Sequence, residues 1–595
     1  MSRARSLPWG PAAAFGVACL VVTWPVLLDP SGIVVGHPCS DVWKHMWGHW
    51  LVHQGLTQDA TFPLTSDMIR FPGGIEFMVI DPVNAVLSTL FRALTGIGVP
   101  AAYNLVVWFD LLFGALAAYW LAREEGCTRG GATVAGTIYA FNPYVLSFGI
   151  ASGVSENLSL PWIPLCLLFL LRCIRRPSVV HAILAGVFYF LTALGTWYYG
   201  FILSSFIMVL VGREALRRGG PLVQSYRPLK FEISWRPIAA VALGLAIAGA
   251  LTVHPARVFS RTLSSDQAME IIHAHGGDER SMPRAVNVPA LFDFVDPRVL
   301  KVEAVADHLY YSHYLGLLVI PLALVGAFRE RRRGLLWTLA FLFFTAAAVG
   351  PNIFFTNTSR LYMHSPLFPV FQAVIPFFDR LHNFVRFSVA ANLALALLAG
   401  MGLAHLAARF PRLRLGSRGA AYALSGLILI DFVFVSALPF PLPRSETALP
   451  EPYVALGHHD EGGILLLPYR KQRYGMAHHF YYCIHHGLGI TLEIAPEEDP
   501  PLIDNGLVAY LARYPATSEN WIDPPPDHDD PGEFLDPDAG LKVLLDDGFR
   551  YAVLDLSVAR EQEAIGITRE LDSRFELVAA EEGVARIYRL DASPE

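Results

Sequence analysis

Residues 376–402 read PFFDRLHNFVRFSVAANLALALLAGMG, and this stretch indicates the fold most clearly. After Arg386 the run is apolar for long enough to cross a bilayer core of about 30 Å. A polar segment with Asp379 and His382 comes directly before it. We therefore predict a membrane-spanning helix near 386–408 that begins with Arg386 at the membrane surface.

The composition extends this prediction to the whole chain. Of 595 residues, 53% are hydrophobic and only 16% are charged, whereas about 25% of residues are charged in soluble globular proteins. The sequence therefore predicts an α-helical polytopic membrane protein. Apolar stretches of spanning length predict about eleven transmembrane helices, near residues 11–28, 100–121, 131–149, 158–174, 179–196, 198–212, 237–255, 313–328, 335–350, 386–408 and 420–438.

Arginine and lysine residues predict the orientation of these helices. Short cytoplasmic loops are rich in both residues, and here they cluster in alternate connections, near 3–5, 123–129, 172–177, 213–236, 329–333 and 409–418. The N-terminus is then cytoplasmic, and an odd number of spans places the C-terminus in the periplasm of a bacterial inner-membrane protein. The formal net charge of −7 gives no reason to expect a nucleic-acid partner.

This topology divides the chain into two domains. Residues 1–438 form a transmembrane domain with large outer loops at 29–99 and 256–312, and residues 439–595 form a periplasmic domain. Strand-like runs at 462–469 and 550–558, a helix-like AGLKVLLDDGF and a terminal hairpin predict an α/β fold for the second domain. Within the first loop, residues 81–99 are apolar enough to lie in the membrane surface as a helix. The alternative is a further span, which would reverse the orientation of all later helices and remove the agreement with the arginine and lysine clusters.

The first outer loop carries the most distinctive candidate, Asp41, within GHPCSDVWKHMWGHW at 36–50. Trp43 and Trp47 follow it at helical spacing, and tryptophans of this kind anchor helices at a membrane interface. The residues alone fit either a solvated loop carboxylate or a functional one.

Other polar candidates lie at the outer ends of predicted spans. Glu156 in SGVSENLS is either solvated at a loop tip or functional. A charged carboxylate close to the membrane raises the free energy of the folded protein unless water or a partner group stabilises it. Arg386 would either bind a lipid phosphate through two parallel hydrogen bonds or pair with Asp379.

A histidine-rich stretch, MAHHFYYCIHHGLGI, lies in the C-terminal domain. We predict that its adjacent histidines point to opposite sides of a strand. All four could then not bind one ion, so a metal site is not expected from His478, His479, His485 and His486.

Several stretches together resemble the polytopic GT-C superfamily of glycosyltransferases, and more closely bacterial membrane proteins of YfhO-like or mannosyltransferase-like type. Members begin with one span, continue with a large outer loop that carries an acidic residue, and end with a soluble outer domain. The matching stretches are SDVWKHMW, FPGG at 71–74, DPVN at 81–84, FNPY at 141–144, SGVSENLSLPWIPL at 152–165, YLGLLVIPLAL and RLHNFVRFSVAANLALALLAGMGLA.

The resemblance implies a reaction. Asp41 would act as the catalytic base that takes the proton of an acceptor hydroxyl, while a sugar leaves a polyprenyl phosphate with inversion. Many members have paired acids in the first outer loop, whereas Asp41 has serine before it and valine after it. Whether a divalent cation, Mg²⁺ or Mn²⁺, takes part in the reaction is therefore left open. Substrate-binding roles are implied for Glu156, His382, Arg386, His486, Trp43 and Trp47.

The sequence therefore predicts a membrane glycosyltransferase that moves a sugar from a polyprenyl-phosphate-linked donor to an envelope glycan, lipid or protein. The alternative is a non-catalytic envelope-assembly protein that uses the same scaffold to bind lipid-linked glycan. Convergence of Asp41, Glu156 and Arg386 on one outward-facing cavity would favour the enzyme.

Overall fold

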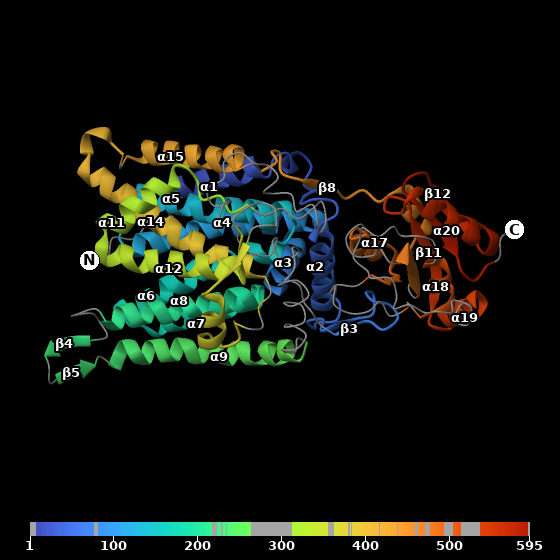
Figure 1. Ribbon diagram of the computed structural model, residues 1–595, viewed down its shortest axis with the longest axis horizontal. Coiled ribbons are helices and arrows are strands. Elements are labelled where there is room, and N and C mark those ends of the chain that lie inside the picture. The colour runs from blue at the N-terminus through green and yellow to red at the C-terminus, as the bar shows by residue number, and fades with distance from the viewer. Residues whose placement is uncertain are drawn as a thin grey trace.

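The structure is a computed structural model with a helical bundle at one end and a smaller sheet domain at the other (Figure 1). The bundle helices run nearly parallel to the long axis of the molecule. The residues that the structure describes are 8–76, 81–216, 223–227, 230–233, 235–262, 312–354, 362–378, 381, 383–415, 417–436, 438–458, 462–469, 476–492, 502, 504–512 and 536–592.

Each of the predicted apolar stretches coincides with a helix of the bundle. These helices are α1 (Trp9–Val22), α4 (Val99–Glu124), α5 (Arg129–Phe141) with a π-helical continuation (Val145–Ala151), α6 (Trp162–Arg175), α7 (Val179–Gly195), α8 (Trp197–Leu216), α9 (Trp235–Thr262), α11 (Val319–Arg329), α12 (Arg331–Val349), α14 (Ser388–Arg409) and α15 (Arg418–Ile430).

The membrane-protein class follows from the length and composition of these helices. Within the described residues, five are long and apolar enough to cross a membrane, or six if α5 and its bent continuation form one span. Five shorter apolar helices accompany them. The predicted class is confirmed, and the count of about eleven spans stays a prediction.

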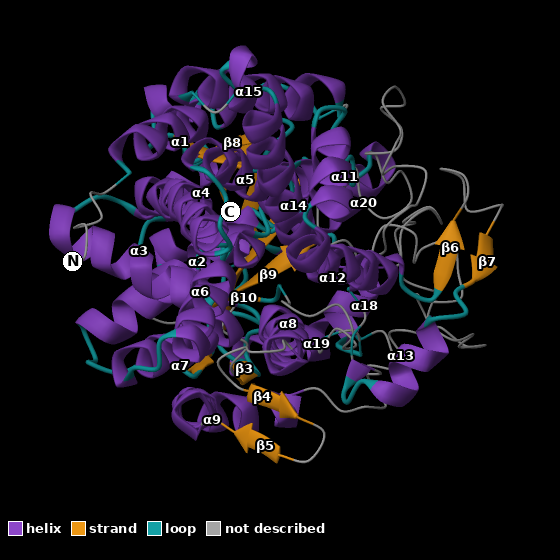
Figure 2. Ribbon diagram, turned by 90° about the vertical axis from the view of Figure 1, so that its left-hand side faces the viewer, coloured by secondary structure: helices purple, strands orange, loops and turns teal. Residues whose placement is uncertain are grey.

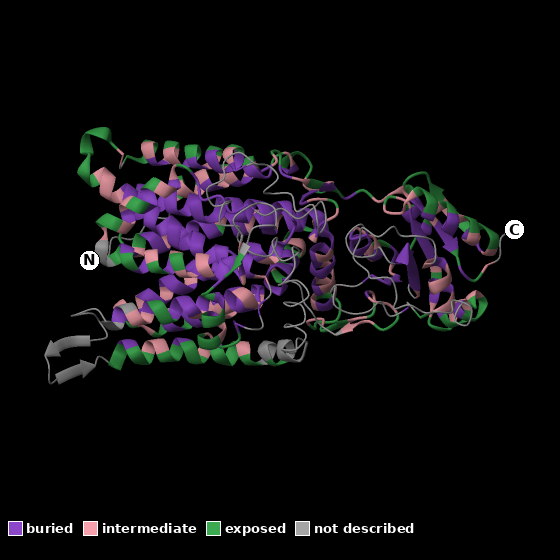
Figure 3. Cartoon of the chain, viewed as in Figure 1, coloured by how far each residue is buried: buried purple, intermediate pink, exposed green. Residues whose placement is uncertain are grey.

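Helix α14 is the centre of the bundle. In its most apolar window 94% of the residues are buried, whereas in the window of α9 only 17% are. Figure 2 looks along the helices and shows α14 among α5, α11 and α12, which pack against it. Figure 3 shows buried residues through the middle of the bundle and exposed ones along α9.

Glycine residues let the neighbouring helices approach α14 closely. A Cβ atom at Gly402 would collide with the carbonyl oxygen of Leu322 on α11, where Gly326 makes the matching close approach. On another side, a Cβ atom at Gly400 would lie 2.6 Å from the carbonyl oxygen of Gly131 on α5. Small residues at helix crossings allow close backbone packing, which drives helix association in membranes where apolar burial contributes little.

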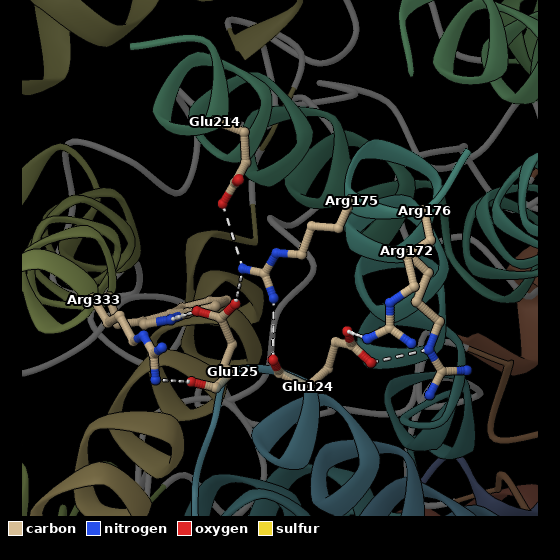
Figure 4. Close-up of polar contacts among 8 residues, drawn as sticks. Glu124, Glu125, Arg172, Arg175, Arg176, Glu214 and Arg333 are labelled. Carbon is tan, nitrogen blue, oxygen red and sulfur yellow. Dashed lines mark hydrogen bonds and ion pairs between the residues drawn. The ribbon is translucent and has the colours of Figure 1, made fainter. Parts of the chain in front are cut away.

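A cluster of ion pairs joins the helix ends that lie farthest from the sheet domain (Figure 4). Glu125 follows α4 and is buried. Its carboxylate accepts hydrogen bonds from Arg175 of α6 at 2.7 Å and from the indole N–H of Trp337 on α12 at 3.0 Å. Arg175 also lies 3.4 Å from Glu214 of α8. Further ion pairs of the cluster join Glu124 to Arg172 and Arg176.

Two helices of the first loop lie at the opposite end of the bundle. Helix α2 (Val42–Thr57) lies across the bundle axis, and α3 (Pro82–Thr95) packs against α2 and α4 (Figure 1). Val86, Leu90 and Leu94 are exposed on α3, as expected for a helix in a membrane surface. Its 14 residues are fewer than the roughly 20 that a span requires, which agrees with an in-plane helix.

The C-terminal domain contains a five-stranded mixed sheet of order β10-β9-β11-β13-β12. Strands β10 (Gly489–Ile490), β9 (Gly463–Leu467) and β11 (Phe549–Asp555) are parallel, and β13 (Ala585–Arg589) and β12 (Glu576–Glu581) form the predicted terminal hairpin. The α/β fold is confirmed. The domain's helices are α16 (Glu451–Leu456), α17 (His479–His486), α18 (Gly506–Ala512), α19 (Pro537–Asp546) and α20 (Glu561–Arg574).

The first loop holds the C-terminal domain at three places. Strand β1 (Ile33–Val35) pairs with β8 (Arg444–Glu446), Ile69 bridges to Ile490 at the edge of β10, and α2 packs against α17. The first loop therefore contacts the C-terminal domain through a separate two-stranded sheet, through the edge of the five-stranded sheet and through a helix. Smaller elements of the described chain are the hairpins β2–β3 (Thr65–Ser66, Ile75–Glu76), β4–β5 (Val223–Arg227, Lys230–Ile233) and β6–β7 (Asn352–Phe354, Tyr362–His364), and α13 (Phe368–Val374).

The histidine-rich stretch of the C-terminal domain is a helix, so the predicted strand is wrong there. His479–His486 form α17, which ends at Gly487 in the left-handed conformation with φ 71°. Adjacent side chains on a helix differ in direction by about 100°, compared with about 180° on a strand. His478 and His479 therefore need not face opposite sides.

We expect Gly402→Ala to destabilise the bundle, because the added methyl group has no room where α14 crosses α11. Overpacking of this kind costs about 1–3 kcal/mol. The measurement is the thermal unfolding midpoint of the detergent-purified protein. Gly249→Ala on α9 is the matched control, since nothing lies within 4 Å of a Cβ atom there. Equal midpoints for the two variants would contradict the close packing.

Candidate functional site

Asp41 lies at the N-terminal end of α2, between the bundle and the C-terminal domain. Its carboxylate is 2.8 Å from Nζ of Lys44, and its side chain is 26% exposed. The preceding strand β1 is paired with β8, and the backbone N–H of His37 donates to the carbonyl of Ala151 at 3.0 Å. Backbone hydrogen bonds thus hold the segment that carries this partly exposed carboxylate.

The turn that carries Glu156 packs directly on the segment that carries Asp41. Gly153 has a positive φ of 63°. A Cβ atom on it would lie 2.6 Å from Oγ of Ser40 and 2.7 Å from the backbone nitrogen of Val42. A side chain at this position would separate the two segments. The glycine therefore brings the Asp41 and Glu156 segments into contact.

Glu156 forms an ion pair with Arg386, which lies in a 3-10 turn (Phe384–Phe387) directly before α14. The same guanidinium donates to Oγ1 of Thr196 at 3.1 Å and lies over the ring of Tyr198, 4.6 Å from its centroid. Both charged side chains are largely buried, at 19% and 13% exposed. The Nε atom of Arg386 has no hydrogen-bond partner among the described residues, so one donor of the guanidinium stays unsatisfied.

Arg386 was predicted to pair with Asp379 or with a phosphate. In the structure its carboxylate partner is Glu156, which the sequence separates from it by 230 positions. Asp379 lies outside the described residues, and so does His382, for which a substrate-orienting role is expected.

A cavity with many polar groups lies inside the bundle close to Arg386. Ser388 and Asn392, on the first turns of α14, form part of its wall. The amide of Asn392 donates to Oδ1 of Asn142 at 3.1 Å, which fixes its orientation. The other lining residues are Tyr144, Ser312, His313, Tyr314, Leu315, Thr345, Ala348 and Ala391.

A buried polar cluster connects the first loop to the Glu156 turn. Asp81 precedes α3 in the left-handed conformation, with φ 64°. Its Oδ2 atom accepts hydrogen bonds from Oγ of Ser155 at 2.8 Å and from Nδ2 of Asn84 at 2.9 Å. His49 of α2 lies 4.0 Å from the same oxygen. Asp81 thereby anchors the residue directly before Glu156.

This cluster was missed from the sequence, although a signal is present in KHMWGHWLVH. His45, His49 and His53 recur every fourth position, which places them on one face of a helix. His45 and His49 are buried. Burial lowers the pKa of His45 to about 3, so its imidazole is neutral near pH 7.

The remaining predicted residues lie where α2 meets α17. Trp43 and Trp47 are buried, and their rings lie 5.6 Å from that of Tyr481 and 6.3 Å from that of Phe480. His486 is buried on the last turn of α17, where its Nδ1 accepts a hydrogen bond from the backbone of Leu488 at 3.2 Å. These tryptophan rings therefore connect the first loop to the C-terminal domain.

The resemblance leaves a divalent cation open, and the contacts of the residues around Asp41 do not favour one. Asp41 contacts Lys44, and Glu156 contacts Arg386, so each carboxylate already has a cationic partner. In the described parts of the chain, one group of three or more metal-binding side chains has ligand atoms within 4.8 Å of one another, and it consists of His478, His479 and Asp555.

Solved structures resemble this chain, whereas no protein-family model and no curated protein sequence matches it. The archaeal oligosaccharyltransferase AglB from Archaeoglobus fulgidus, in complex with an inhibitory peptide and a dolichol-phosphate, has a TM-score of 0.50 at 12% identity, over 96% of this chain and 72% of its own. The arabinofuranosyltransferase AftD from Mycobacteria has a TM-score of 0.52 at 14% identity, over 98% of this chain and 40% of its own. ArnT from Cupriavidus metallidurans, bound to undecaprenyl phosphate, has a TM-score of 0.49 at 13% identity, over 99% of both chains.

The likeness to AglB and AftD identifies the fold. Both are GT-C glycosyltransferases, and the match covers nearly all of this chain. The chain therefore has the GT-C fold, as its sequence predicted. It spans less than half the length of AftD.

We expect Asp81→Ala to destabilise the first loop and the Glu156 turn, because it removes the buried acceptor that the side chains of Ser155 and Asn84 share. Each unsatisfied buried donor costs about 1–3 kcal/mol. The thermal midpoint should therefore fall clearly, whereas Asp67→Ala, at an exposed position of the same loop, should change little. A midpoint for Asp81→Ala as high as that of the Asp67 variant would show that the cluster does not anchor the turn.

Proposed function

We propose that this protein is a membrane glycosyltransferase that transfers a sugar from a polyprenyl-phosphate-linked donor to an envelope glycan, lipid or protein. The arrangement of Asp41, Glu156 and Arg386 carries the proposal. Their segments come from distant parts of the chain and meet at the end of the bundle that faces the C-terminal domain. A lipid phosphate is bound in the AglB structure of the same fold, which supports a donor of this class.

Asp41 is the catalytic base in this proposal. Its partly exposed carboxylate takes the proton of the acceptor hydroxyl as the acceptor oxygen bonds to the anomeric carbon. The bond between that carbon and the phosphate oxygen breaks on the opposite face, so the configuration inverts. The proton ends on Asp41, and the lipid phosphate leaves with the bonding electrons.

Arg386 binds the phosphate of the donor. A guanidinium presents its donors in a planar fork that matches two phosphate oxygens, and Nε of Arg386 is the donor without a partner among the described residues. Glu156 and Thr196 hold the guanidinium in place before the donor binds. The positive charge then stabilises the negative charge that develops on the leaving phosphate.

The arginine-rich helix ends support a reaction at the outer face of the inner membrane. Arg175, Arg333 and Arg409 lie at the end of the bundle opposite the C-terminal domain. Under the positive-inside rule that end is cytoplasmic. Asp41, Glu156 and Arg386 would then lie on the periplasmic side.

We expect Asp41→Asn to abolish sugar transfer while the protein stays folded, because an amide cannot accept the proton. A membrane assay with a panel of polyprenyl-phosphate-linked sugars measures the transfer. Asp59→Asn, at an exposed position just after α2, is the matched control and should keep the wild-type rate. Transfer by Asp41→Asn at the wild-type rate would refute the assignment. Binding of lipid-linked glycan by the wild type without transfer to any acceptor would instead support the envelope-assembly alternative.

We expect Arg386→Lys to raise the KM for the donor about tenfold or more, because lysine keeps the charge and loses the fork. Hydrogen bonds to charged groups contribute about 1.5–3 kcal/mol each, and 1.4 kcal/mol corresponds to a factor of about ten. Initial rates over a series of donor concentrations give the KM. Arg409→Lys, exposed at the other end of α14, should leave it unchanged. An unaltered KM for Arg386→Lys would place the phosphate elsewhere.

A further inference from the structure

We propose that His478, His479 and Asp555 bind a zinc ion in the C-terminal domain and that this ion fastens α17 to the central sheet. The site is separate from the proposed transfer chemistry. It joins two elements far apart in sequence, because the histidines stand at the start of α17 and Asp555 is the last residue of β11. The carboxyl ends of parallel strands are a common position for ligand sites in α/β sheets.

The distances between the three side chains fit a single ion. Nε2 of His478 lies 2.8 Å and Nε2 of His479 lies 3.2 Å from Oδ2 of Asp555, and one ligand atom from each residue lies within 4.8 Å of the others. Tetrahedral zinc with bonds of about 2.0–2.1 Å separates its ligands by about 3.3 Å, so Nε2 of His478 has to move away from Oδ2 when the ion binds. Two imidazoles and one carboxylate are ligands that zinc prefers, and three protein ligands leave a fourth position for water.

The surroundings of Asp555 match a metal-binding carboxylate. Its second oxygen, Oδ1, accepts hydrogen bonds from the backbone nitrogen of Ser557 at 2.9 Å and from its hydroxyl at 2.5 Å. Such outer hydrogen bonds orient the carboxylates that bind metals. Oδ2 consequently points at the two histidines.

The contacts of His479 are compatible with an ion. Its Nε2 lies 3.2 Å from Oδ2 of Asp555 and 3.2 Å from the hydroxyl of Tyr453. Without an ion, a neutral imidazole donates Nε2–H to Oδ2. With the proton on Nδ1 instead, the lone pair of Nε2 points to the same place and is free to bind a cation.

The entrance to the site lies beside His478. The His479 and Asp555 side chains are 1% exposed and that of His478 is 17% exposed, so an ion can enter beside His478.

A zinc ion at this site would also stabilise the contact between the C-terminal domain and the first loop. Tyr481 and Phe480, on the first turn of α17, contact Trp43 and Trp47 of α2. An ion that fixes α17 on β11 therefore also fixes α2, which begins directly after Asp41. Metal binding and sugar transfer are measured separately, so a failure of one proposal does not imply a failure of the other.

The test uses the full-length detergent-purified protein, stripped with a chelator and then supplied with zinc. We expect one zinc ion per chain by elemental analysis after desalting, and a higher thermal midpoint with zinc than without. Cobalt(II) in place of zinc should give the visible absorption bands of a tetrahedral site. A wild-type protein that retains no zinc after desalting, or whose midpoint does not respond to zinc, would overturn the proposal.

His478→Ala is the diagnostic variant, because this partly exposed ligand is the one whose loss disturbs the core least. It should weaken zinc binding by more than the roughly 10- to 100-fold found when outer-shell partners of a metal are removed. It should also abolish the zinc-dependent rise of the midpoint and the cobalt bands. His485→Ala on the same helix is the matched control and should bind zinc like the wild type. Equal zinc affinity of the His478 and His485 variants would also refute the site.

Discussion

The close approach of backbones along α14 is the constraint on which the rest of the structure depends. Glycines at 326, 400 and 402 remove the side chains that would hold α11 and α5 away, so α14 is buried along nearly its whole length. In a bilayer this contact compensates for the small gain from burying apolar groups. Arg386 lies directly before α14, and its position therefore follows from the position of that helix.

The outer end of the bundle is organised by the first loop. The β1–β8 pairing, the bridge from Ile69 to Ile490 and the aromatic contacts between α2 and α17 attach the C-terminal domain to it. The same loop supplies Asp41 and the buried carboxylate of Asp81. One segment therefore positions the proposed base, anchors the Glu156 turn and holds the domain that covers them. Loops held by a rigid scaffold often carry functional residues, and the first loop, which carries Asp41, is held by the bundle in this way.

Charge is distributed unevenly along the bundle, and each charged group is stabilised in a different way. At the arginine-rich end, Glu125 is buried and is satisfied by Arg175 and Trp337. Within the bundle, Oδ1 of Asp431 accepts a hydrogen bond from the hydroxyl of Tyr314 at 2.8 Å, and its Oδ2 has no hydrogen-bond partner among the described residues. At the outer end the Glu156–Arg386 pair is largely buried, and Nε of Arg386 has no hydrogen-bond partner in the part of the chain that the structure describes. Removing two charges from water costs free energy that their mutual attraction often does not recover. The desolvation cost of the Glu156–Arg386 pair therefore agrees with a functional role.

The sequence by itself determined the membrane class, the apolar stretches that became helices and the α/β character of the C-terminal domain, because hydrophobic length and periodicity are local properties. The GT-C fold was predicted from the resemblance of several stretches to that superfamily. It also directed attention to Asp41, Glu156 and Arg386 as chemically distinctive residues. Only the tertiary structure decided the partners, because contacts between distant segments leave no local pattern. Arg386 pairs with Glu156, which lies 230 positions away in the sequence. Asp81, which stands in the DPVN stretch, binds Ser155 and Asn84 and so anchors the turn before Glu156. His478 and His479 converge on Asp555 because α17 is a helix, and the side-chain directions of a helix depend on a backbone conformation that tertiary packing selected.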